Sequence, residues 1–221
     1  MMKVRDFYNK TAGMYDTRHD TPTTLLLRGK ELALIRRYAR GRVLDIGCGT
    51  GYHMRFIKDV TGIDTSREMV KRARETGKRV LQGSAERLPF GDGSFGTVLC
   101  LFTVLNMCDP GRAVKEMARV LEPGGRAIIS VASVHDSGKS RSKRFRVGGE
   151  RFMLRMFTRE ELTEIFEGNG FSLLRFDSLF RAHKPVWGSF RRFSLAEKAK
   201  LRLEGFLPKE RGRIYLMVFG R

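Results

Sequence analysis

The most constraining feature of the sequence is a short, largely apolar segment, Val43–Ile46, that runs directly into a loop with glycine at Gly47, Gly49 and Gly51. Such a segment is typical of a buried strand bounded by turn residues. Glycine lets the backbone turn sharply and lets a ligand approach it without a Cβ in the way. Residues 52–58 are predicted to open a helix, whose free N–H groups suit an anionic or strongly polar ligand. The segment therefore predicts a strand, a ligand-binding turn and a helix.

The glycine spacing distinguishes two kinds of nucleotide-like ligand. The dinucleotide fingerprint G-x-G-x-x-G/A requires glycine or alanine at position 52, which is Tyr52 here. With Asp45 ahead of it, the loop has the form D-x-G-x-G-x-G, which resembles the first motif of class I S-adenosylmethionine-dependent methyltransferases. The resemblance implies that Asp45, the loop glycines and Thr50 bind S-adenosylmethionine. Taken alone, the loop is also compatible with a tight turn that binds nothing.

A second predicted strand, Val60–Asp64, ends in a carboxylate. An acid at this place is positioned to accept hydrogen bonds from both ribose hydroxyls of a nucleoside lying across the strand ends. The alternative role of Asp64 is helix capping, although Ser66 is itself a suitable cap for the helix that contains Met69. The distance from the glycine loop favours the ribose role, and Met69 is expected in the same pocket.

The segment after the third strand, Gly83–Phe90, resembles the family motif G-D-A-x-x-L-P-F. In the family, the acidic position binds the adenine amino group and the next backbone N–H binds a ring nitrogen. This sequence has Ser84 at the acidic position, followed by Ala85. The resemblance implies adenine contacts from these two residues, with Glu86 as an alternative acceptor.

The fourth predicted strand lies within Gly93–Phe102, with Gly96 where the family usually has aspartate. The resemblance implies that the backbone carbonyl near Leu101 accepts a hydrogen bond from the methionine amino group of the cofactor. Asn106 is predicted either to face the pocket or to be a turn residue that binds its own backbone.

A helix followed by Pro123-Gly124-Gly125 and a strand resembles the family form R-x-L-x-P-G-G. Alternating strands and helices predict an α/β fold with the ligand at the carboxyl ends of the strands. The resemblance, to type 11 and ubiquinone/menaquinone-biosynthesis-like methyltransferases, implies a Rossmann-like, doubly wound, mostly parallel seven-stranded sheet with an antiparallel C-terminal strand. It implies one methyltransferase domain over 1–221, made of a helical lid 1–40, a cofactor-binding core 41–132, and basic insertions 135–156 and 178–212.

Three residues are candidates for catalysis. The opening resembles the Y-x-x-x-A-x-x-Y-D segment that covers the cofactor pocket in small methyltransferases, which makes Tyr15 a candidate pocket residue. Asn106 is the second, and His135, just past the fifth strand, is the third. The sequence contains no metal-binding cluster, and its cysteines, Cys48, Cys100 and Cys108, are expected to be reduced and structural.

The charge of the chain is strongly positive, with 43 Lys and Arg against 24 Asp and Glu and a formal net charge of +19. Residues 139–155 hold seven basic residues against one acidic residue, and the Arg and Lys residues of 181–213 alternate with Trp187, Phe190 and Phe193. Basic residues bind phosphates and aromatic rings stack on bases, so the pattern favours an RNA partner. The alternative is a highly charged, heat-adapted surface.

Three functional hypotheses follow for an expected cytoplasmic protein. The first is in-line methyl transfer to RNA, in particular tRNA, and the second is transfer to a small molecule or a quinone. The third is a module that binds S-adenosylmethionine without catalysis. Because the sulfonium donor is already activated, positioning and water exclusion supply most of the acceleration, and a nitrogen nucleophile with a free lone pair needs no base.

Overall fold

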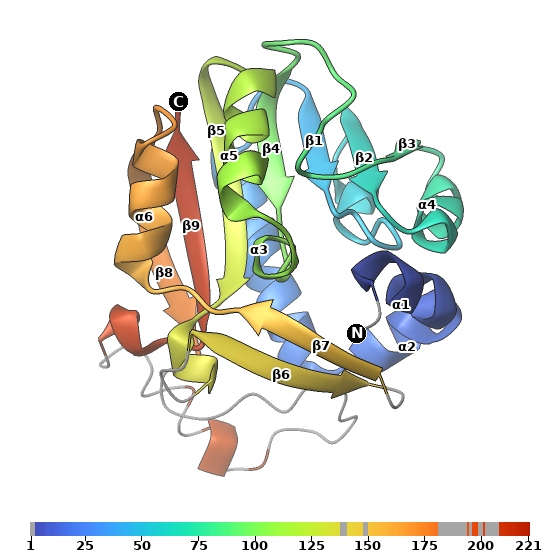
Figure 1. Cartoon of the computed structure of the whole chain (residues 1–221), viewed down its shortest axis with the longest axis vertical. Helices are drawn as coiled ribbons and strands as arrows, with labels where there is room; N and C mark the ends of the chain where they lie inside the picture. The colour runs from blue at the N-terminus through green and yellow to red at the C-terminus, as the bar shows by residue number, and fades with distance from the viewer. Residues whose placement is uncertain are drawn as a thin grey trace.

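The computed structural model describes residues 3–137, 141–147, 150–180, 194, 196–198, 201 and 208–221. Its centre is a seven-stranded sheet with the order β3-β2-β1-β4-β5-β9-β8 (Figure 1). The strands are β1 (Val43–Ile46), β2 (Val60–Asp64), β3 (Arg79–Gln82), β4 (Phe95–Cys100), β5 (Leu121–Ala132), β8 (Ser172–Leu179) and β9 (Ile214–Gly220). The predicted Rossmann-like sheet is confirmed.

The pairing of the strands places the expected ligand site. β1 is parallel to both β2 and β4, with Val43 opposite Val60 on one side and Thr97 on the other. β9 is antiparallel to both β5 and β8, as predicted for the final strand. The carboxyl ends of β1, β2 and β4 therefore meet at one edge of the sheet, where α/β sheets of this kind bind ligands.

Helices cover both faces of the sheet. In Figure 1, α5 and α6 lie on one face, α3 lies on the other, and α1 and α2 lie beyond the carboxyl ends of the strands. The helices are α1 (Val4–Thr11), α2 (Tyr15–His19), α3 (Pro22–Tyr38), α4 (Arg67–Arg74), α5 (Pro110–Val120) and α6 (Arg159–Glu167). Thr21, Ser66, Asp109 and Thr158 cap α3, α4, α5 and α6 through side chains that accept a backbone N–H. The predicted cap at Ser66 is confirmed.

The sheet separates two apolar clusters, because successive side chains of a strand point to opposite faces. Leu44 and Ile46 of β1 pack in the cluster that contains the buried side of α5. Val43 packs with Ile35 of α3 in the other cluster. Asp45 shares the face of Val43 and therefore lies on the α3 side of the sheet, which matters for the site below.

The helix predicted over residues 52–58 is wrong. The chain forms only a short 3₁₀ helix, η2 (His53–Phe56), and is already extended at Ile57. Met54 is fully buried in the cluster that also contains Cys48 and Val60, while Phe56 on the same short turn is 55% exposed. Few residues separate the loop from Val60, so the chain turns once and enters β2.

The first of the two basic insertions has regular structure in the part that the structure describes. Residues 134–155 contain the 3₁₀ helix η4 (Val134–Ser137) and a hairpin of β6 (Ser142–Val147) and β7 (Glu150–Arg155). In Figure 1 the hairpin points towards the N-terminal helices. Lys139 and the segment 181–193, with its interleaved aromatic residues, lie outside the described residues.

Glycine at position 96, where the family usually has aspartate, has a steric reason. A Cβ on Gly96 would lie 2.5 Å from the carbonyl oxygen of Arg40. The neighbouring Thr97 hydroxyl donates to the same carbonyl and accepts from the Arg40 N–H. β4 is therefore held against the chain that leads into β1, at a distance that only glycine allows.

Within the described ranges, no helix combines the length and apolar composition that a bilayer crossing requires.

Candidate functional site

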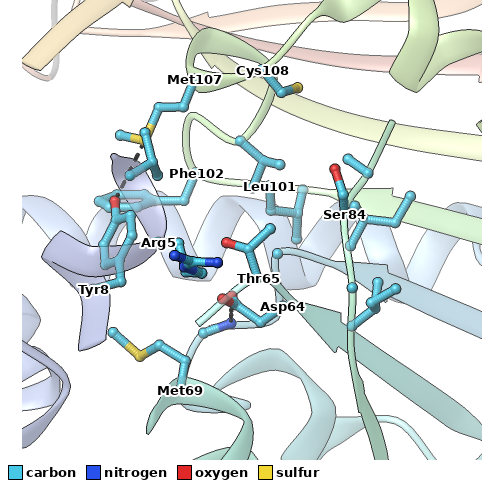
Figure 2. Close-up of a pocket in the computed structure, with 18 of the residues that line it drawn as sticks. Arg5, Tyr8, Asp64, Thr65, Met69, Ser84, Leu101, Phe102, Met107 and Cys108 are labelled. Atoms are coloured by element: carbon cyan, nitrogen blue, oxygen red, sulfur yellow. Dashed lines mark hydrogen bonds between the residues drawn. The ribbon is translucent and has the colours of Figure 1, made fainter. Parts of the chain in front are cut away.

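A cavity of about 210 Å³ lies at the carboxyl ends of β1, β2 and β4, under α1. Figure 2 shows Asp64 and Met69 on one side of it, Ser84 on another, and Tyr8 beneath Met107. A second cavity of about 40 Å³ adjoins it on the α3 side. The two cavities share Tyr15, Gly47, Gly49, Leu101 and Phe102 in their walls. They are called the large and the small cavity below.

The two walls include most residues predicted to bind the cofactor. The set comprises Asp45, Gly47, Gly49, Thr50, Asp64, Met69, Ser84, Ala85 and Leu101. Gly51 is different, because it is not in the described lining of either cavity and a Cβ there would lie 2.9 Å from Thr76. With a φ of +79°, Gly51 serves the packing of the loop against α4.

Asp64 is held by the loops on either side of it. Its carboxylate accepts hydrogen bonds from the backbone N–H of Gly49 at 3.0 Å and of Ser66 at 2.8 Å. Burial raises the pKa of Asp64 above its ordinary value, and these backbone donors partly offset that rise. The side chain is thus fixed at the junction of β1 and β2, facing the large cavity.

The turn after β3 supplies small polar groups. The Ser84 hydroxyl accepts the Glu86 N–H at 3.2 Å, and both residues line the large cavity. The Glu86 carboxylate accepts the N–H of Asp109, the cap residue of α5. Glu86 is therefore bound to the start of α5, which leaves Ser84 in the position of the family acid.

The opposite end of the large cavity is aromatic and apolar. The Tyr8 hydroxyl lies 3.7 Å from the sulfur of Met107, and the rings of Tyr8 and Tyr15 are 6.0 Å apart. His19 lies between Tyr15 and Phe102, at ring distances of 4.0 and 5.4 Å. Burial raises the pKa of both tyrosines, so their hydroxyls stay protonated at neutral pH.

The N-terminal segment is attached to the core beside each cavity. The side-chain oxygen of Asn9 accepts hydrogen bonds from the Ser66 hydroxyl at 2.8 Å and the Glu68 N–H at 3.3 Å. Asp16 accepts the Thr50 hydroxyl at 2.7 Å. These contacts join α1 to the start of α4 and α2 to the glycine loop, and Tyr8 and Tyr15 of this segment line the large cavity. The assignment of residues 1–40 as a lid stays a prediction.

The small cavity is surrounded by charged groups that are almost completely buried. Glu31, fully buried on α3, lies 3.0 Å from the His53 Nε2 as an ion pair and accepts the Ser130 hydroxyl at 2.5 Å. The Arg28 guanidinium lies 3.8 Å above the ring of Tyr52. Such buried charges are costly unless they are paired or have a ligand.

Asp45 carries one of three buried atoms of this cluster that lack a hydrogen-bond partner among the described residues. The other two, Glu31 Oε2 and His53 Nε2, face each other as the ion pair. Asp45 is 2% exposed, and the unpartnered atom is its Oδ2. Burial raises the pKa of Asp45 to about 7, His53 opposes this rise, and the nearby carboxylates of Glu31 and Asp64 add to it. For His53, burial lowers the pKa, but the hydrogen bond and charge of Glu31 outweigh it and the net shift is upward. The small cavity therefore has a free acceptor for a cation.

Sequence analysis did not identify Arg28, Glu31, His53 or Ser130 as site residues. The available signal was the buried face of α3, where Thr24, Arg28 and Glu31 recur at helical spacing among apolar residues. A polar interruption of an apolar stripe indicates either a buried network or a ligand. The four side chains come from α3, η2 and β5, so no local motif contains them.

Two of the three catalytic candidates lie outside the described walls of the cavities. The Asn106 amide donates to the carbonyls of Ala132 and Arg155 and accepts the Ala132 N–H, so it joins η3 (Leu105–Met107), β5 and β7. The expectation that Asn106 faces the pocket is corrected, because its amide is bound to backbone. His135 lies in η4, where its carbonyl accepts from Arg213. Tyr15 lines both cavities.

Comparison with known proteins shows what this chain resembles. A family model described as a methyltransferase domain matches residues 44–129. An uncharacterised protein of Methanocaldococcus jannaschii is 36% identical over 138 residues, which cover 61% of this chain and 54% of that protein. A phosphatidylethanolamine N-methyltransferase of Cereibacter sphaeroides is 40% identical over 109 residues, 44% of this chain and 54% of that protein. The chain spans about half the length of these two relatives.

A ubiquinone/menaquinone biosynthesis C-methyltransferase of Geotalea daltonii is 34% identical over 158 residues, 58% of this chain and 66% of that protein. Two solved structures share the fold. An S-adenosylmethionine-dependent methyltransferase from Thermotoga maritima is 24% identical with a TM-score of 0.68, covering 98% of both chains. A chain in complex with the Trm112 methyltransferase activator of Haloferax volcanii is 24% identical with a TM-score of 0.67, covering 99% of this chain and 96% of that one.

Proposed function

We propose that this chain is a class I S-adenosylmethionine-dependent methyltransferase and that it transfers the methyl group of S-adenosylmethionine to a small acceptor held at the aromatic end of the large cavity. The observation that carries the proposal is the pair of adjoining cavities. One is walled by Asp64, Ser84 and aromatic rings, and the other by buried charges. Adenosine suits the first, and the amino-acid part of the cofactor suits the second.

The adenosine part is proposed to lie against β2 and the turn after β3. Asp64 would accept the ribose hydroxyls, for which a fixed carboxylate is the matching acceptor. Ser84 and the Ala85 N–H would contact adenine, and Met69 would pack against the nucleoside. The positive φ of Gly47 and Gly49 supports the proposal, because the backbone of both residues lines the cavity without a side chain.

The amino-acid part is proposed to enter the small cavity. Its ammonium would bind the free Oδ2 of Asp45 and the Leu101 carbonyl, while its carboxylate would bind the Arg28 guanidinium. The orphaned oxygen of Asp45 is the independent sign that these residues fit the group. The bound cofactor supplies an activated methyl group, and the residues around it orient the acceptor and exclude water.

A small, apolar acceptor is favoured by the aromatic end itself. Tyr8, Phe102 and Met107 form a wall suited to a flat or aliphatic group. Burial raises the pKa of the nearby Cys108 thiol to about 12, so this group holds its proton as the tyrosines do. The named activity of one relative, in ubiquinone and menaquinone biosynthesis, supports an apolar acceptor.

RNA is the second candidate, and the net charge of +19 is the observation that favours it. The described hairpin β6–β7 contributes Arg144 and Arg155 at exposed positions. Binding through phosphates would fall steeply with salt concentration, whereas binding of a neutral small molecule would not. The proteins named above do not include an RNA methyltransferase.

A labelled-methyl transfer assay tests the two candidates. The purified protein is given methyl-labelled S-adenosylmethionine with total RNA, and separately with a lipid and small-molecule extract of the same cells. The proposal is supported if wild-type protein transfers label to a molecule of the extract and the Asp64→Ala variant does not. Label in RNA alone overturns it in favour of the second candidate. Cofactor binding without label in either sample would indicate a non-catalytic module.

A further inference from the structure

The turn after β4 has an unusual backbone. Phe102 and Thr103 are consecutive residues with positive φ, at 53° and 72°, and neither is glycine. Residues other than glycine rarely adopt this backbone conformation, and such strain persists only where the surrounding structure holds the backbone in place. The preceding residue, Leu101, lines both cavities at their junction. Whatever fixes the turn therefore also fixes the carbonyl of Leu101.

Ser130 of β5 holds this turn from below. Its hydroxyl oxygen accepts the Phe102 N–H at 2.6 Å, and its carbonyl accepts the Thr103 N–H at 3.3 Å. The Ser130 side chain is 1% exposed. Both donors of the strained turn are thus bound to one residue of the neighbouring strand.

Glu31 determines how the Ser130 hydroxyl is oriented. A serine hydroxyl has one hydrogen, and Ser130 donates it to the Glu31 Oε1 at 2.5 Å. With the hydrogen directed at α3, the oxygen lone pairs are available to the Phe102 N–H. The other Glu31 oxygen faces His53, which follows the glycine loop. One buried carboxylate therefore links the glycine loop, β5 and the turn after β4.

We propose that Glu31 is a positioning residue for methyl transfer: through Ser130 it fixes the turn at Phe102–Thr103, and with it the Leu101 carbonyl that receives the cofactor ammonium. The inference rests on the proposed placement of the amino-acid part in the small cavity. Glu31 does not need to touch the cofactor for this role. It acts through the direction of one hydroxyl hydrogen.

Two ligands separate this role from a general contribution to stability. S-adenosylhomocysteine keeps the amino-acid part of the cofactor, whereas 5′-methylthioadenosine lacks it. Affinities for both are measured by calorimetry on the full chain. Ser130→Ala is expected to weaken S-adenosylhomocysteine about tenfold and to change methylthioadenosine less than about twofold, because only the former uses the Leu101 carbonyl.

Three further variants complete the test. Ser130→Thr keeps the hydroxyl and should restore the affinity for S-adenosylhomocysteine. Glu31→Gln keeps an oxygen that accepts the Ser130 hydroxyl. Its affinity for S-adenosylhomocysteine should therefore lie between those of wild type and Ser130→Ala. Ser133→Ala is the matched control, because Ser133 is fully buried just after β5 and its hydroxyl donates to the Gly212 carbonyl, away from the turn. It should leave both affinities unchanged.

Several results would overturn the inference. One is an equal loss of affinity for S-adenosylhomocysteine and for methylthioadenosine in Ser130→Ala, which would indicate a structural role alone. Another is wild-type affinity for S-adenosylhomocysteine in folded Ser130→Ala, or in folded Glu31→Met if Ser130→Ala does not fold. If wild-type protein binds methylthioadenosine as tightly as S-adenosylhomocysteine, the placement of the amino-acid part fails first, and the proposed function must be revised.

Discussion

The large and the small cavity are built in different ways. The large cavity takes polar groups from the ends of strands, such as Asp64 at the end of β2 and Ser84 two residues after β3. The small cavity takes Arg28 and Glu31 from a helix that precedes the whole sheet and His53 from a turn. The first combines backbone and small neutral groups with the charged side chains of Arg5, Asp64 and Glu86, whereas the second concentrates charge that is almost completely buried. A uniformly polar pocket would not offer chemically different places to the adenosine part and to the zwitterionic amino-acid part of the proposed cofactor.

The largest expected effect of a single change lies in the large cavity. Asp64→Ala should weaken binding of S-adenosylmethionine by about 100-fold or more, because a carboxylate bound to two hydroxyls makes two charge-assisted hydrogen bonds. Calorimetric titration measures the change. Asp59→Ala is the matched control, since Asp59 is an exposed acid just before the same strand. An Asp64→Ala protein that is folded and binds with wild-type affinity would remove the ribose assignment.

A smaller, pH-dependent effect is expected in the small cavity. Burial raises the pKa of Asp45 to about 7, so much of this carboxyl is protonated at neutral pH before the ligand binds. A bound ammonium favours the ionised form and lowers that pKa, so binding must expel protons and the affinity must rise as the pH increases through about 7. Glu31, His53, Arg28 and Asp64 are the charged groups that act on this equilibrium.

Calorimetry in buffers of different ionisation enthalpy measures the protons released. Wild-type protein should release about half a proton from Asp45 at pH 7. Asp45→Asn should release fewer protons and show a flatter dependence of affinity on pH, with His53 accounting for what remains. An unchanged release in Asp45→Asn would move the origin of the protons to another group of the cluster.

The smallest expected effect concerns the predicted lid, residues 1–40. Two variants of this segment again compare the two cavities. Asn9→Ala removes a contact beside the large cavity, and Asp16→Ala removes one beside the small cavity. Each should raise the dissociation rate of S-adenosylmethionine about two- to tenfold, as expected for the loss of one or two hydrogen bonds. Stopped-flow fluorescence measures the rate. Asp6→Ala, which removes only an exposed pair with Arg5, should leave the rate unchanged.

Local patterns were sufficient to predict the sheet and the large cavity. Val43–Ile46 is buried on both faces, and such strands have the continuous apolar character that the sequence displays. Asp64, Ser84 and Leu101 were found because each belongs to a motif beside its own strand. Their contacts with the cofactor, and the division of the chain into lid, core and insertions, stay predictions.

The small cavity could not be predicted from local patterns, because its contacts join distant residues. Glu31 and Ser130 are 99 residues apart, and their hydrogen bond depends on how α3 lies across β5. The helix expected after the glycine loop was wrong for a related reason. Burial of Met54 and the short distance to Val60 determine that segment, and helical propensity does not.

The position of β9 has a consequence for synthesis of the chain. All of Ile214–Gly220 is buried, and this strand separates β5 from β8, both of which leave the ribosome earlier. Until β9 emerges, each of those strands has an unpaired edge that another chain could pair with. Closure of the sheet must wait for β9, so the nascent protein passes through a period in which chaperone binding or aggregation competes with folding.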